Sequence, residues 1–268
     1  MSKNNTTKDI PRTRAPYTRW TDDEMIITLD LYFKLTFGRL NRGTPEVIQL
    51  ANLIGKTSNA VAMRLTNFAA CDPYIVNSGR HGLEGGRKKC LPFWNYYSVR
   101  KNELVEKAAV IRARLENKSI EQLFSISPSD LVGREKEVVI KQRIHQDAFR
   151  MMILNNYNQH CAVTGIGIPQ LLVASHIIPW ADDENERLNP ENGICLSSLY
   201  DKAFDRGLIG VDTNYKIILS GQLKEYHKEE YFDKHFSIVE NQKLILPEEH
   251  KPDKDFLEYH MRHVFLGR

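Results

Sequence analysis

A histidine and two aspartates have the residue types and spacing for hydrolytic chemistry. His176 lies inside the apolar run ASHIIPW, which is typical of a short buried strand ended by Pro179. Asp201 and Asp205 are four residues apart in SSLYDKAFD, so on a helix both carboxylates can point at one place. A divalent cation would relieve their repulsion, and an imidazole can accept a proton from water near neutral pH. The plainer interpretation is a hydrogen-bonded core histidine and two solvent-facing acids.

The elements that must position these residues follow one another closely. Short strands are predicted at LLVASHII, NGICL, LIGVD and KIILS, with a polar loop over 181–190 and a helix around SSLYDKAFD. A turn at Asp212-Thr213-Asn214 makes the last two strands a hairpin. Helices are predicted at VVIKQRIHQDAFRMMILNNYN before the strands and at DKDFLEYHMRHVF after them.

The segment CAVTGIGIPQLLVASHIIPWADDENERLNPENGICLSSLYDKAFDRGLIGVD resembles the HNH endonuclease family, whose core is a ββα-metal fold. Within that family it is most similar to the branch found in restriction-type nucleases. QRIHQDAFRMMILNNY upstream and EYHMRHVF downstream also resemble this branch. The resemblance therefore covers about residues 135–268.

The resemblance implies a role for each motif residue. His176 matches the general base that activates water, and Asn192 matches the asparagine that pins the loop between the strands. Asp201 stands where the family usually has a metal-binding histidine, and Asp205 matches the acidic residue one turn later. Ser175 departs from the family, since many relatives place a ligand there. The implied cofactor is a divalent metal ion, Mg²⁺ or Mn²⁺.

The N-terminal half contains three predicted helices in a helix-turn-helix pattern. RWTDDEMIITLDLYFKLTF opens with a capping box, GTPEVIQLANLIG ends at a glycine, and KTSNAVAMRLTNFAA is capped at Thr57 or Ser58. The third helix would present Asn59, Arg64 and Asn67 on its polar side; a plain helical bundle is the alternative. RWTDDE and LANLIGKTSNAVAMRL resemble Myb-like modules, which precede HNH domains in some modification-dependent restriction enzymes.

A glycine-rich segment, NSGRHGLEGGRKK, combines backbone freedom with positive charge. Glycines allow close approach of a backbone, and the cations suggest that phosphate is what approaches. The candidate DNA contacts are Arg80, Arg87, Lys88 and Lys89, and a solvated loop without function is the alternative. The neighbouring PFWNYY either lines a base-contacting pocket or belongs to the core.

Charge is distributed unevenly along the chain. Residues 1–140 carry 22 Lys and Arg against 15 Asp and Glu, whereas residues 141–268 carry 15 against 19. A basic half favours a polyanionic partner. The polar N-terminus excludes a secretory signal, no apolar run is long enough to span a membrane, and four widely spaced cysteines indicate free thiols. We expect a cytoplasmic protein with no membrane partner.

These patterns predict an α+β protein with a mainly helical DNA-binding domain followed by an HNH ββα-metal nuclease domain. The predicted divisions are a flexible basic arm at 1–16, a helix-turn-helix-like recognition domain at 17–116, a linker at 117–136 and the nuclease domain at 137–268.

The sequence thus predicts a metal-dependent endonuclease that acts on double-stranded DNA. The resemblance implies a restriction enzyme, and the pairing of modules implies modified (5-methyl or hydroxymethyl) cytosine as a target; whether the modification is required stays open. One HNH site normally cuts one strand, so cleavage of both strands suggests a homodimer. Two alternatives stay open: a DNA-binding regulator with an inactive HNH fold, and a nuclease directed at RNA.

Overall fold

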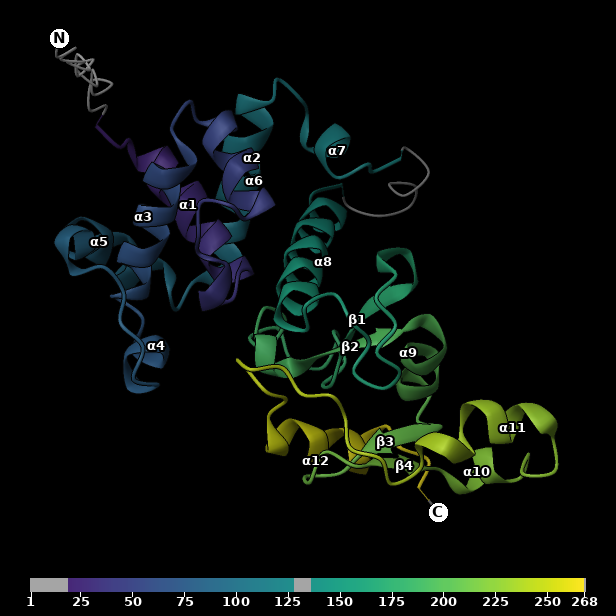
Figure 1. Cartoon of the computed structure of the whole chain (residues 1–268). Helices are drawn as coiled ribbons and strands as arrows, with labels where there is room; N and C mark the ends of the chain where they lie inside the picture. The colour runs from purple at the N-terminus through teal and green to yellow at the C-terminus, as the bar shows by residue number, and fades with distance from the viewer. Residues whose placement is uncertain (1–18, 128–135, 268) are drawn as a thin grey trace, which may run out of the picture.

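The computed structural model describes residues 19–127 and 136–267. The arm predicted at 1–16 and residues 128–135 of the predicted linker lie outside these residues. Within the described part the chain combines helices with two small antiparallel sheets, as the α+β prediction requires. Helices α1 to α6 gather in one group, and α8 leads from them to the strands (Figure 1).

The first half of the described chain is helical. Its helices are α1 (Asp22–Lys34), α2 (Pro45–Leu53), α3 (Ser58–Ala69), α4 (Pro73–Asn77), α5 (Arg87–Tyr97), α6 (Lys101–Leu115) and α7 (Ile120–Leu123). The local signals are confirmed: Thr21 and Glu24 form the capping box of α1, and the Thr57 side chain caps α3. Gly55 ends α2 with φ +65°, a conformation that glycine adopts without strain.

The glycine-rich segment is corrected by the structure. It is not one loop, because Arg87, Lys88 and Lys89 form the first turn of α5. Two of its glycines, Gly82 and Gly86, permit close contact with α3, and contact with phosphate stays a prediction. A Cβ atom on Gly82 would lie 2.1 Å from the backbone nitrogen of Ala70, and one on Gly86 would lie 2.0 Å from the side chain of Asn67.

The second half begins with α8 (Lys136–Asn156), which packs on a hairpin of β1 (Leu172–His176) and β2 (Gly193–Ser197). Helix α9 (Ser198–Asp205) follows β2 directly and lies against both strands. The second hairpin, β3 (Ile209–Val211) and β4 (Ile217–Leu219), turns at Asp212 as predicted. The remaining helices are α10 (Gly221–Lys224), α11 (Glu230–His235) and α12 (Lys254–His263).

Each half has its own hydrophobic core, and α6 belongs to both. Leu104, Ala108 and Ile111 face the helical core, whereas Val105 and Ala109 enter the core around α8 and the strands. The four cysteines are free and buried. No helix in the described ranges is long and apolar enough to cross a membrane.

Polar contacts also join the halves. The side chain of Asn155 on α8 donates to the Lys34 carbonyl over 2.8 Å and accepts from Arg39 over 2.7 Å. The Glu249 carboxylate accepts from the Phe37 amide and from Arg80. Helix α7 lies inside the predicted linker, and the division into independent domains stays a prediction.

Candidate active site

The β1–β2 hairpin and α9 place His176 and the carboxylates of α9 at the border of one cavity. In the antiparallel register His176 lies opposite Gly193, and Ser175 lies opposite Ile194. Neighbouring side chains on a strand point to opposite faces. The Ser175 hydroxyl therefore faces α9, where it donates to the Asp201 carboxylate, while His176 faces Phe149 of α8.

The imidazole of His176 is held by one hydrogen bond and two aromatic rings. Its Nε2 lies 3.1 Å from the Arg187 carbonyl, so Nε2 carries the proton and donates. Nδ1 is then the basic nitrogen. The Phe149 ring stacks on the imidazole with centroids 3.6 Å apart, and the Trp180 ring meets it edge-on at 5.3 Å.

Burial sets the protonation state of His176. It lowers the pKa of this histidine to about 4; the hydrogen bond to the Arg187 carbonyl opposes this shift, and the charge of Arg187 adds to it. The imidazole is therefore neutral at pH 7, which is the state a general base requires.

Gly193 explains how Phe149 comes to lie against the histidine. A Cβ atom at this position would lie 2.3 Å from Ile153 Cδ1 and 2.7 Å from Phe149 Cζ. The absence of a side chain thus lets α8 pack closely on the hairpin. Sequence reasoning missed Phe149 as a site residue, because nothing in the α8 pattern indicates which apolar residue will contact His176.

Asn192 is buried at the base of the loop between the two strands. Its Oδ1 accepts from the Ile178 amide over 2.8 Å, and its Nδ2 donates to the Glu186 carbonyl over 3.1 Å. These bonds tie the start of the loop to its end, the position that the family resemblance implies for the motif asparagine.

Asp201 and Asp205 lie on the face of α9 that borders the site. Both line a cavity of about 520 Å³, together with His176, Lys202 and Arg206. Loss of surrounding water and the nearby charge of Asp201 both raise the pKa of Asp205. Two carboxylates that disfavour each other's charge provide a place for a cation.

The donor set suits a hard metal ion that keeps several of its waters. No cluster of three or more His, Cys, Asp or Glu side chains able to hold a metal occurs in residues 19–127 and 136–267. Mg²⁺ is commonly bound by only one or two carboxylates plus phosphate oxygens and water. Asp201 and Asp205 fit that pattern, and Ser175 orients Asp201.

A second cavity, of about 550 Å³, adjoins the first and shares His176 and Trp180 with it. It is lined by Arg112, Arg143 and Arg150. Arg143 and Arg150 are seven residues apart on α8, which places them on one helical face. This spacing was visible in the sequence, but the prediction treated α8 only as a helix.

Residues 161–212 match the family model described as HNH endonuclease. The match supports an HNH endonuclease domain in this segment. The matched range contains β1, β2, α9 and β3, and with them every motif residue from His176 to Asp205. A comparison with curated proteins finds no match for the chain.

The residues proposed to bind DNA lie in the helical half, away from the HNH domain, and several are engaged by the fold. Arg64 is 6% exposed, lies 4.8 Å from the Trp20 ring centroid and contacts Cys90, so its placement on an exposed polar face is wrong. Asn67 is buried too and donates to the Leu83 carbonyl. Packing of the half-buried Trp20 and the buried Cys90 against Arg64 turns this part of α3 inward.

The remaining candidates differ in their availability. Arg80 is bound to the buried Glu249, and Arg87 donates to the Ala70 carbonyl over 2.9 Å while its side chain stays half exposed. Asn59, Lys88 and Lys89 have exposed side chains. The structure therefore leaves an exposed cationic turn at the start of α5.

Proposed function

We propose that the protein is a metal-dependent endonuclease that hydrolyses phosphodiester bonds of double-stranded DNA. One observation carries this proposal: a neutral histidine, fixed through Nε2, borders the same cavity as two carboxylates. An HNH domain implies a nuclease, and a nuclease domain implies DNA as its substrate.

In the proposed mechanism, Nδ1 of His176 accepts a proton from a water molecule, which attacks the phosphorus atom. The Arg187 carbonyl keeps the proton on Nε2 and thereby fixes which nitrogen is basic. Asn192 holds the loop that contains this carbonyl. Asp201 and Asp205 would hold the divalent ion, which supplies charge neutralisation at the phosphate and at the departing 3′-oxygen. Arg143 would receive a flanking phosphate, whereas Arg150 beside it donates to the Leu172 and Pro169 carbonyls.

We further propose a restriction role with dependence on modified cytosine. The support is the resemblance of the domain pairing to modification-dependent restriction enzymes. A homodimer is expected if both strands are cut, since one site normally cuts one strand.

The test is cleavage of supercoiled plasmid with and without cytosine methylation, in Mg²⁺, in Mn²⁺ and in EDTA. Cleavage that needs metal supports the endonuclease, and cleavage restricted to methylated plasmid supports the finer proposal. A linear product in place of a nicked circle supports a dimer. The runner-up, a DNA-binding regulator with an inactive HNH fold, predicts DNA binding without cleavage in every arm. Cleavage of RNA in preference to both plasmids would favour the RNA-directed alternative.

A further inference from the structure

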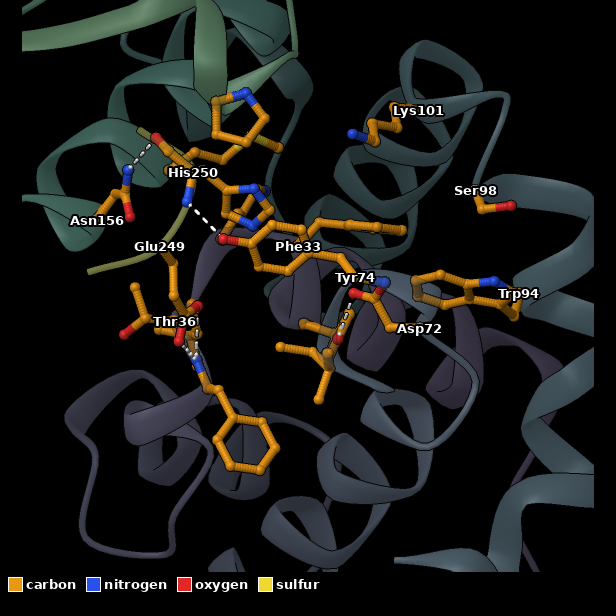
Figure 2. A pocket seen from close by; sticks show the side chains of 17 residues that line it. Phe33, Thr36, Asp72, Tyr74, Trp94, Ser98, Lys101, Asn156, Glu249 and His250 are labelled. Carbon is orange, nitrogen blue, oxygen red and sulfur yellow. Dashed lines mark hydrogen bonds between the residues drawn. The ribbon is translucent and has the colours of Figure 1, made fainter. Parts of the chain in front are cut away.

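A cavity of about 200 Å³ lies between the helical half and the HNH half, away from His176. Helices α1, α4, α5 and α6 form one side of it. The other side consists of α8, the segment at Glu249 and His250, and Pro190 of the loop between β1 and β2. Figure 2 shows side chains from both halves converging on this cavity.

Aromatic rings form much of its wall. Phe33 and Trp94 stack with centroids 5.3 Å apart, and Tyr74 stacks on His250 at 4.2 Å. Tyr74 is 38% exposed, so this second pair borders solvent. Flat rings on several sides favour a flat, aromatic ligand.

Lys101 places an unpaired cation in the cavity. Its ammonium lies 5.3 Å from the Phe33 ring centroid and is turned toward the aromatic side chains (Figure 2). No hydrogen-bond acceptor or ion-pair partner in the described part of the chain contacts it. Burial lowers the pKa of this lysine, against the charges of Asp72, Glu186 and Glu191, which raise it. Its place at the first residue of α6 also sets its charge against the helix dipole.

Hydrogen-bond acceptors lie on both sides of the cavity: Asn156 of α8 is opposite Lys101, and Asp72 at the start of α4 is on the same side as Lys101. Asn156 is 5% exposed; its Nδ2 donates to the His250 carbonyl, while its Oδ1 is buried without a partner among the described residues. Asp72 accepts from the Tyr32 hydroxyl and the Tyr74 amide, and a carboxylate has capacity for more donors. A fitting ligand thus combines an acceptor for Lys101, a donor for these oxygens and a flat ring.

We propose that this cavity binds a single nucleobase, with Lys101 donating to a ring carbonyl or ring nitrogen and Oδ1 of Asn156 opposite it receiving an exocyclic amine. The base comes either from a free nucleotide or from a nucleotide extruded from DNA; the second source rests on the proposed function. Pro190 gives the cavity a connection to catalysis, since it lies two residues before Asn192. Occupancy would thereby bear on the loop that positions His176.

The test measures binding of the four deoxynucleosides to the full-length protein by calorimetry, in EDTA. Lys101→Met removes the ammonium and keeps the aliphatic stem, and Lys228→Met, at an exposed lysine, is the matched control. At least one nucleoside should bind the wild type and the control. Its affinity should fall about tenfold or more in Lys101→Met, the loss expected for a hydrogen bond from a charged donor. Thermal melting should show Lys101→Met to be folded, because the change removes a desolvated, unpaired charge.

A second arm identifies the source of the base. Duplexes with one mismatched pair extrude a base at lower cost than matched duplexes. A preference for mismatched duplex that Lys101→Met abolishes supports the extruded base, and nucleoside binding without that preference supports the free nucleotide. The proposal is overturned if no nucleoside binds at millimolar concentration and no mismatch preference exists, or if Lys101→Met behaves as the control does. Neither arm needs cleavage, so an inactive nuclease would not obscure the result.

Discussion

The helical half (residues 19–127) and the half that contains the HNH match (residues 136–267, the HNH half) differ in how they use the polar residues singled out by sequence. In the HNH half, His176, Asp201 and Asp205 keep chemically available atoms at the border of one cavity. In the helical half, Arg64 and Asn67 are consumed by internal packing, and Arg80 is bound to Glu249. An ordered motif specifies where a side chain must act. A basic composition indicates that a cationic surface is present, but it does not indicate which residues form that surface.

Loss of the general base His176 should cause the largest decrease in cleavage. His176→Ala removes Nδ1, so cleavage of plasmid should fall by about 10²–10⁴-fold while DNA binding persists. The control is His227→Ala, at an exposed histidine of the same half. Activity within about tenfold of wild type would remove His176 from the mechanism.

Loss of either carboxylate should affect metal dependence next. In Asp201→Asn and Asp205→Asn the half-maximal Mn²⁺ concentration should rise on the order of 10–100-fold, and Ser175→Ala should give a smaller rise because it removes only an orienting hydrogen bond. Titration of cleavage against Mn²⁺ measures this, with Asp233→Asn as an exposed control. Unchanged titrations in both aspartate variants would show that these side chains are surface acids.

Stability should depend on pH through His260. Burial lowers the pKa of this histidine to about 4, with Phe204 stacked on the ring and its carbonyl bound to Nε2. The unfolded chain has an ordinary histidine pKa of about 6.5, so below that pH it binds the proton that the folded state rejects. Stability is therefore full above about pH 6.5 and is lost as pH falls toward 4. From pH 7 to pH 5 this histidine should remove about 2 kcal/mol.

Urea unfolding of the wild type and of His260→Gln at both pH values measures this contribution. The glutamine keeps a donor for the Phe204 carbonyl but does not titrate, so the difference between the two pH values should shrink in the variant. An equal difference in both proteins would assign the acid sensitivity to other groups.

The smallest effects should come from cations and decide which half carries the phosphate contacts. Arg143→Ala should flatten the slope of log K against log salt by about 0.9, and the Arg87→Ala, Lys88→Ala double variant by up to about 1.8, if each cation contacts one phosphate. DNA binding across a salt series measures both, with Arg262→Ala as control. An unchanged slope in the double variant would leave DNA binding to the HNH half.

Local signals in the sequence were sufficient to predict the helices and turns. Side-chain environments that depend on long-range packing could not be predicted. The capping box at Thr21 and the Asp212 turn depend on residues within a few positions, and both are confirmed. Asn192 was placed by a motif whose spacing encodes the loop. The burial of Arg64 depends on Trp20 and Cys90, and the environment of His176 depends on Phe149. Such partners lie 26 or more residues away, where no periodicity indicates them.

The position of α6 in both cores has a consequence for unfolding and proteolysis of the protein. Leu104 and Val105 are consecutive residues of one helix, yet they are buried in different cores. Unfolding of either half would therefore expose apolar residues of the other half to water. The chain should therefore unfold in one cooperative transition, and a protease should not release either half as a stable product. The same helix limits how this helical module could be transferred to another nuclease by recombination. A nuclease that acquires this helical module must also acquire a surface on α8 that fits the far side of α6.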